Sequence, residues 1–229
     1  MTRATSLEDG AAHRAGSYFL FSRLLHEPPS AASLRVLADT LASIRSEGVL
    51  EGDLAELHRV ADASAGNERH VTDLAVEFTR ILGGLSERNG APPIESVARE
   101  GKLLGETTAA VSIAYAEAGF PEPLPEAGPP DHLATELRFL ALCCHEEAQA
   151  WKRADGAAAL AWLERERTFL DEHLLAWAPA YCVSLAARST ASYYTVLARL
   201  IAEGCSVDRE DLTAVLDDAR SMPRRRRAR

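Results

Sequence analysis

A proline-rich segment in the middle of the chain sets the strongest limit on its fold. Five prolines fall within residues 120–130, in the stretch FPEPLPEAGPP. Proline has no backbone N–H and a fixed φ, so prolines at alternate positions forbid a helix and favour an extended, polyproline-like backbone. We therefore expect residues 120–130 to be a stiff connection between two halves of one domain, residues 1–119 and 131–223.

Both halves carry the sequence pattern of helices. The 229 residues are 47% hydrophobic but only 6% aromatic, and the abundant Ala and Leu are strong helix formers. Apolar residues recur at three- and four-residue spacing, as at Leu34, Leu37, Leu41 and Ile44, whereas no strand-like alternation is found. The sequence predicts an all-α protein, a single globular domain of about nine helices.

Several helix boundaries carry specific expectations. Gly119 is a natural stop for the helix before the proline-rich segment, and Asp131 is expected to begin the helix after it. Pro179 is expected in the first turn of a helix, where proline is tolerated. The last six residues, RRRRAR, are expected to extend a disordered tail over 224–229. The remaining helices that bear on the argument are expected over 95–118, 157–177, 179–201 and 208–220.

The net charge narrows the class of partner. It is −9, and it would be −14 without the five arginines among the last six residues. A body this acidic repels phosphate backbones, so the sequence predicts no nucleic-acid binding and an attraction for basic ligands.

Cysteine usage and hydropathy indicate the compartment. Cys143, Cys144, Cys182 and Cys205 fit no zinc-binding spacing and are expected to be reduced thiols. The N-terminal stretch lacks an apolar signal-peptide core, and no run approaches the ~18 apolar residues of a membrane span. We expect a cytoplasmic protein that is not an integral membrane protein.

An acid–histidine pair, Asp131 and His132, follows the prolines directly. Asp is a favoured helix N-cap, so Asp131 is expected to cap the helix that it opens, with His132 in the first turn. A catalytic pair would also need a nucleophile or a bound water. The chain has no G-x-S-x-G, H-E-x-x-H or P-loop motif, and we expect no enzymatic activity.

Two other readings of this region stay open. A helical metal-dependent hydrolase would use His132, Glu136 and His145, although two ligands one turn apart still need partners elsewhere. Cys143 and Cys144 precede His145, but consecutive helical residues point about 100° apart and cannot converge on one ion. A non-catalytic scaffolding protein is the other alternative. The long loop before Glu95 is a further candidate site, because long loops in compact helical domains are often functional.

Three stretches together resemble one protein family. They are LAVEFTRILGG with APPIESV at 74–97, GPPDHLATELRFLALCCHEEA at 128–148, and FLDEHLLAWAPAYCVSLAARSTASYYTVLARL at 169–200. This pattern is similar to that of the TorD/DmsD/NarJ family of cytoplasmic chaperones for molybdenum enzymes. The likeness runs from the first helix to about residue 203, and its most specific part is P-D-H-L-x-x-E-L-x-F-L.

The resemblance implies a helical, non-enzymatic chaperone. Such a protein binds the twin-arginine signal peptide or the body of a molybdopterin oxidoreductase catalytic subunit, assists cofactor insertion and delays export until the enzyme is mature. It implies no intrinsic cofactor, a possible transient contact with the client's molybdopterin guanine dinucleotide, and a monomer or a domain-swapped dimer. The acidic body suits this role, since guanidinium groups pair well with carboxylates.

The same resemblance implies which residues bind the signal peptide or client. In this chain Ile94 stands where an aromatic residue often precedes Glu-Ser, and Gly83-Gly84 replaces a glycine–proline after the leucine. A joint change of Asp131 to Asn and His132 to Ala is expected to weaken signal-peptide binding roughly tenfold or more. The implied binding residues are Phe78, Leu82, Glu95, Ser96, Pro130, Asp131, His132 and Glu136.

Overall fold

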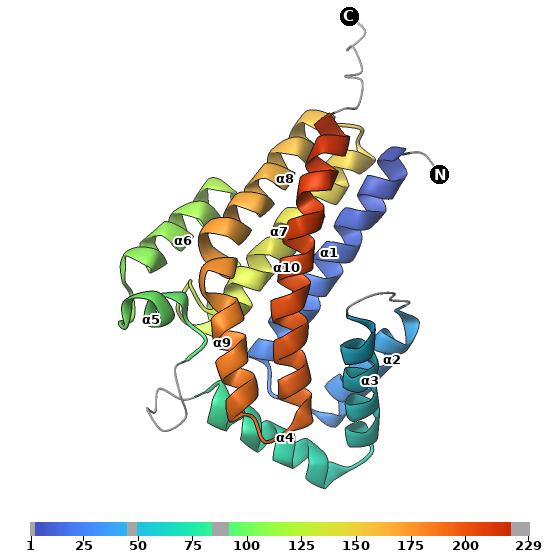
Figure 1. The fold of residues 1–229 in the computed structure, drawn as a ribbon, viewed down its shortest axis with the longest axis vertical. Helices are drawn as coiled ribbons and strands as arrows, with labels where there is room; N and C mark the ends of the chain where they lie inside the picture. Colours follow the sequence, from blue (N-terminus) through green and yellow to red (C-terminus); the bar gives the residue numbers. More distant parts are fainter. Residues whose placement is uncertain (1–2, 45–49, 84–91, 221–229) are drawn as a thin grey trace, which may run out of the picture.

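The computed structural model describes residues 3–44, 50–83 and 92–220, and within them it is all-helical, as expected (Figure 1). A π-helical turn, η3 (Leu170–Leu174), joins α8 and α9 without a break, so the described helices form nine continuous runs. None of them is long and apolar enough to cross a membrane. The helices are α1 (Arg3–His26), α2 (Ala31–Ser43), α3 (Glu51–Ala65), α4 (Glu68–Ile81), α5 (Glu95–Glu100), α6 (Glu106–Glu117), α7 (Leu133–Lys152), α8 (Gly156–Phe169), α9 (Leu175–Arg188) and α10 (Ser192–Arg220).

A bundle of long helices forms the core. In it α1 runs along α7, and α8 and α10 pack beside them (Figure 1). Ala11 of α1, Leu137 of α7, Leu163 of α8 and Leu197 of α10 have no exposed surface. Burying such apolar side chains is the main favourable contribution to folding. The first helix of the chain is therefore packed against helices from beyond the proline-rich segment.

The helices α2, α3 and α4 cover one end of the bundle (Figure 1). The Tyr194 hydroxyl of α10 donates a hydrogen bond to the Leu74 carbonyl of α4 at 2.7 Å. Arg199 of α10 forms a two-pronged ion pair with Asp53 of α3, with N···O distances of 2.5 and 3.0 Å. These contacts fix the end layer on the first turns of α10.

The prediction of a single helix over residues 95–118 is wrong, because the helix that begins at Glu95 ends at Gly101. Gly101 has φ +72°, the left-handed conformation that glycine adopts readily at a helix C-terminus. The chain then turns and begins α6 at Glu106. Glu100 caps this second helix, since its carboxylate accepts the backbone N–H groups of Glu106 at 3.2 Å and Thr107 at 2.7 Å.

Pro179 does not begin a helix, as was expected, but lies inside α9. A proline inside a helix removes one hydrogen bond and costs about 3 kcal/mol. Trp177 and Cys182, on either side of it, are buried, and this packing keeps the chain helical. The true break is at residues 189–191, and α10 then continues through Gly204 to Arg220. The separate helix expected over 208–220 is therefore the end of α10.

The proline-rich segment holds no α-helix, only a short 3-10 turn, η2 (Pro125–Ala127). Leu124 is buried and anchors it to the core, and Gly128 has φ +95°, which favours glycine. The division of the domain into halves stays a prediction, as does the basic tail 224–229, which lies outside the described residues.

Candidate functional site

Two backbone segments that are distant in sequence meet beside the start of α7. Ile94 and His132 form an isolated antiparallel bridge. Next to it, the Glu95 N–H donates a hydrogen bond to the Asp131 carbonyl at 2.9 Å. The loop before α5 is thereby tied to the end of the proline-rich segment, which brings most of the residues predicted from sequence into one place.

Asp131 caps a helix other than its own. Its side chain is fully buried, and its Oδ2 accepts the backbone N–H of Ser96, in the first turn of α5, at 2.7 Å. Ile94, the N-cap residue of α5, has no side chain that can cap, so Asp131 supplies the acceptor. The expectation that Asp131 caps α7 is wrong. The N-cap of α7 is His132, whose Nδ1 accepts the Ala134 N–H at 3.1 Å.

His132 is half-buried and uncharged at neutral pH. Burial lowers its pKa to about 4, and the charge of nearby His26 lowers it further, while Asp131 acts in the opposite direction. A neutral imidazole is also what the cap requires, because only an unprotonated Nδ1 can accept the Ala134 N–H. His132 therefore acts in this structure as a hydrogen-bond acceptor and not as a cation.

Glu136 and Glu95 form a buried pair of carboxyl groups. Neither has exposed surface, and the Trp177 indole N–H donates to Glu136 Oε2 at 3.1 Å. Burial raises the pKa of Glu136 well above its usual range, and the charge of Glu95 and a hydrogen bond between the two carboxyl groups raise it further. Glu136 is therefore protonated at neutral pH.

Glu95 also contacts two other side chains. Its Oε1 accepts from Arg99 Nη1 at 2.5 Å, and its Oε2 lies 3.2 Å from Nδ1 of His173 in the π-turn η3. Arg99 also donates to the Glu172 carbonyl at 3.1 Å. Sequence reasoning found Glu95 and Glu136 but missed these partners. The four-residue spacing of Glu95 and Arg99 on one helix is a local signal that points to their ion pair.

Tyr115 anchors the prolines beside this cluster. Its hydroxyl donates to the Pro130 carbonyl at 3.0 Å. The ring has no exposed surface and packs on Phe139 and Phe169, with centroid distances of 4.6 and 5.8 Å. Pro130 itself is half-buried, so this predicted residue is held through its backbone.

Phe78 and Leu82 lie apart from the cluster, at the C-terminal end of α4, and residues 84–91 between them and the cluster are outside the described chain. Phe78 is half-buried and Leu82 is buried. Their neighbour Glu77, which sequence reasoning missed, accepts the Thr190 N–H at 2.7 Å. The hydrogen bond from Arg80, followed by those from Thr190, lowers the pKa of Glu77 to about 2. Glu77 thus holds α4 on the turn between α9 and α10.

The geometry does not favour the metal-dependent hydrolase. Among the described residues, no group of three or more His, Cys, Asp or Glu side chains is placed to hold a metal ion. His145 is exposed on α7, thirteen residues after His132, which separates the two by about 20 Å along the helix. Burial raises the pKa of the Cys143 and Cys144 thiols well above the usual range, so both stay protonated.

A second buried charge cluster, also missed from sequence, joins α1 to α7, α8 and α10. The Arg14 guanidinium contacts the carboxylates of Glu147, Glu166 at 3.2 Å and Asp208 at 3.3 Å. The Tyr18 hydroxyl donates to Asp208 at 2.5 Å. Burial, followed by the charge of Glu147, raises the pKa of Glu166 to about 8. One cation therefore serves three acids, of which Glu166 is largely protonated at pH 7.

Replacing Asp131 by Ala should lower the free energy of unfolding by about 1–3 kcal/mol, because the Ser96 N–H loses its cap in a buried place. Asp131→Asn keeps an acceptor oxygen and should lose less. Urea unfolding of the purified variants measures both. An Asp131→Ala variant as stable as the wild type would show that the cap contributes nothing to the fold.

The free energy of unfolding should fall as the pH rises from about 6.5 to about 8. In this window Glu166, whose folded pKa is about 8, still holds a proton that the unfolded chain has lost. The unfolded state binds fewer protons, so stability falls by up to about 1.4 kcal/mol per pH unit for each such carboxyl. His132, with its lowered pKa, has the opposite effect, but only below about pH 6.5.

Glu166→Gln is the matched control for this pH dependence. It cannot ionise, so its unfolding free energy should fall less steeply than that of the wild type between pH 6.5 and 8. Chemical denaturation at several pH values measures the two slopes. Equal slopes would mean that Glu166 is already ionised in the folded protein.

Comparison with known proteins gives a family and several relatives. A family model described as nitrate reductase delta subunit matches residues 47–183. The selenate reductase assembly chaperone of Thauera selenatis is 45% identical over 62 residues, 27% of this chain and 31% of that protein. The chlorate reductase assembly chaperone of Ideonella dechloratans is 42% identical over 74 residues, 31% and 37% of the two chains. Chaperone protein TorD of Photobacterium profundum is 27% identical over 138 residues, 59% and 62%.

Each match covers less than two thirds of the relative's own length. All three relatives are named chaperones and none is named an enzyme, which supports the prediction that the chain is not an enzyme. The family model covers more than half of the chain, and its described part has the expected all-helical fold. The chain therefore belongs to the nitrate reductase delta subunit family, and its resemblance to the TorD/DmsD/NarJ chaperones is confirmed.

Proposed function

We propose that this protein is a cytoplasmic chaperone for the catalytic subunit of a molybdopterin oxidoreductase. It binds the subunit's twin-arginine signal peptide, its body or both, assists cofactor insertion and delays export until the enzyme is mature. The observation that carries the proposal is the family match over residues 47–183, together with relatives named as reductase assembly chaperones.

The electrostatics support a basic ligand. The net charge of −9 attracts a signal peptide that carries two adjacent arginines. We propose that the chain has no cofactor of its own and meets the client's molybdopterin guanine dinucleotide only while the client is being loaded. It acts as a monomer or as a domain-swapped dimer.

The residues implied by the family resemblance divide into two groups by exposure. Asp131, Glu95, Ser96 and Glu136 have no exposed surface and are bonded to interior partners. We infer that these four serve binding indirectly, by fixing the backbone where the proline-rich segment meets α5 and α7. Pro130 and His132 at this place are half-buried and remain available for direct contact, as is Phe78 at the end of α4, whereas Leu82 is buried.

The test uses the catalytic subunit of a molybdopterin oxidoreductase from the same organism. Its signal peptide and its mature body without the signal are titrated separately into the purified chaperone at low salt. Binding of either one, with less molybdenum in the enzyme when the chaperone gene is deleted, is the expected result. An enzyme that is fully loaded and exported without the chaperone, and that binds it in neither form, would overturn the proposal.

A further inference from the structure

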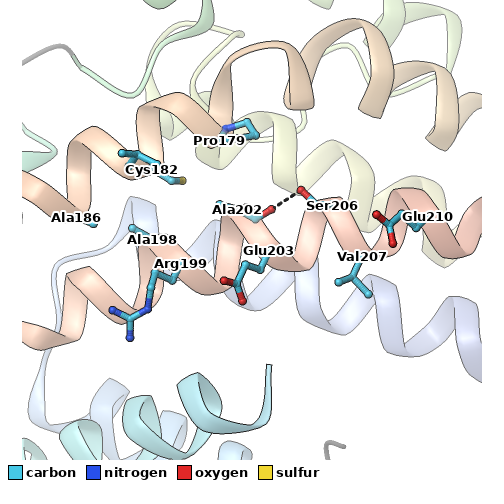
Figure 2. Close-up of a pocket in the computed structure, with 11 residues that line it drawn as sticks. Pro179, Cys182, Ala186, Ala198, Arg199, Ala202, Glu203, Ser206, Val207 and Glu210 are labelled. Atoms are coloured by element: carbon cyan, nitrogen blue, oxygen red, sulfur yellow. Dashed lines mark hydrogen bonds between the residues drawn. The ribbon is translucent and has the colours of Figure 1, made fainter. Parts of the chain in front are cut away.

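A groove of about 550 Å³ runs between α9 and α10 on the outside of the bundle (Figure 2). Small side chains leave this space open, with Ala186 on α9 facing Ala198 and Ala202 on α10. Pro179 and Cys182 continue the α9 wall. The groove is therefore lined mainly by small and apolar side chains.

Apolar side chains at its edges are exposed. Val183 of α9 is 71% exposed and Val207 of α10 is 36% exposed, and both line the groove. An exposed valine on each of two facing helices, above a floor of alanines, is the arrangement that an apolar segment of another chain can cover.

The charges that line the groove are acidic. Glu203 and Glu210 stand seven residues apart on α10, which is two helical turns and about 10 Å along the same face. Neither forms a hydrogen bond or ion pair with another described side chain. Arg199, the basic residue among those lining the groove, is paired with Asp53 and points toward α3 (Figure 2). The charges of Asp53 and Glu203 both act on Arg199, so the groove carries two carboxylates and one guanidinium that is paired with Asp53.

We propose that this groove binds a partner segment in which two adjacent arginines precede an uncharged apolar stretch. The apolar stretch lies between α9 and α10 against Val183 and Val207, and the guanidinium groups pair with Glu203 and Glu210. This inference rests on the proposed function and names the surface that receives the signal peptide. A second copy that docked through the same groove would bring the same two carboxylates together, and that repulsion disfavours such a symmetric pair.

The buried cluster and the groove share one helix. Trp177 of α9 donates to Glu136, and two residues later Pro179 lines the groove. At the start of the same continuous helical run, His173 contacts Glu95. The buried residues of the family motif thus set the position of α9, and α9 presents one wall of the groove. Mutation of the motif can therefore alter binding without any contact between the motif and the peptide.

The experiment measures fluorescence anisotropy with a defined probe. The probe is a fluorescein-labelled peptide with two adjacent arginines followed by twelve leucine and alanine residues, titrated with the full chain at low salt. We expect the joint change Glu203→Lys and Glu210→Lys, and separately Val183→Asp, to weaken binding at least tenfold. A peptide with glutamines in place of the arginines should bind the wild type about as weakly as the arginine peptide binds the double variant.

The matched control variants make the same changes of charge and polarity on another face of the protein. Glu117→Lys with Glu122→Lys changes the net charge equally at exposed positions, and Ile113→Asp alters a 58% exposed apolar residue on α6. These variants should bind the probe within about twofold of the wild type. Circular dichroism confirms that every variant is folded.

The outcomes separate this inference from the proposed function. If the groove variants bind the probe as tightly as the wild type, the groove is not the binding surface. The same holds if the control pair Glu117→Lys and Glu122→Lys lowers the affinity as much as the pair Glu203→Lys and Glu210→Lys. In both cases the chaperone role stands. If the wild type fails to bind the arginine peptide but binds the mature body of the client, the groove proposal is overturned and the maturation role is kept. A loss of affinity for the arginine peptide that is confined to the groove variants supports the proposal.

Discussion

Replacing Arg14 by methionine should lower the free energy of unfolding by about 3–5 kcal/mol, the cost of removing one partner from a buried ion cluster. Arg14 faces Glu147, Glu166 and Asp208 in the interior of the bundle. Without the guanidinium, Glu147 and Asp208 must stay charged without a counter-ion or take up protons, as Glu166 largely does already. Because proton uptake is easier at low pH, the loss should be smaller at pH 5 than at pH 8.

Thermal and urea unfolding of Arg14→Met measure this loss. Arg23→Met on the same helix is the control, because Arg23 forms an exposed pair with Glu27, at 3.1 Å, and such pairs contribute less than about 1 kcal/mol. A similar small effect for both variants would show that the Arg14 cluster is solvated in solution and is not a buried centre of the fold.

Replacing Tyr115 by alanine should destabilise the protein by about 3–5 kcal/mol, the usual cost of removing a large aromatic side chain from a core. The ring is fully buried between Phe139 of α7 and Phe169 of α8, and it holds α6 against both. Its loss leaves a cavity and frees the Pro130 carbonyl, which accepts from the hydroxyl. We therefore expect the proline-rich segment to become more susceptible to proteolysis as well.

Tyr115→Phe separates the two contributions. It keeps the ring and removes only the hydrogen bond to Pro130, so it should cost about 1 kcal/mol. Urea unfolding compares the variants, and limited proteolysis reports on residues 120–130. If Phe at this position costs as much as Ala, the hydroxyl and not the packing of the ring holds the segment.

The fold was predictable because helices follow from local periodicity, and the errors lie where tertiary contacts override local rules. Pro179 reads locally as a helix start, but buried neighbours on both sides keep it inside α9. The spacing of apolar residues places Gly101 inside the helix predicted over 95–118. In the structure Gly101 has a left-handed conformation and separates α5 from α6. Neither outcome follows from spacing along the chain.

The candidate site was predictable only as a set of residues. Asp131 does cap a helix, as its residue type predicts. The helix that it caps is α5, however, which begins 36 residues earlier in the chain. Glu95 and Glu136 were selected through the family resemblance as residues that bind the signal peptide or client, yet they are buried against each other. Burial depends on which helices pack together, and a sequence pattern does not state that. The groove between α9 and α10 was missed for the same reason.

The packing of α1 has a consequence for how the chain is synthesised. Arg14 is synthesised almost two hundred residues before its last acidic partner, Asp208. At 5–20 residues per second, the first helix waits roughly 10–40 s for that partner. During translation it exposes the apolar face that later covers α7. The core is therefore completed only after α10 has been synthesised, and until then the nascent chain exposes apolar surface that the folded protein buries.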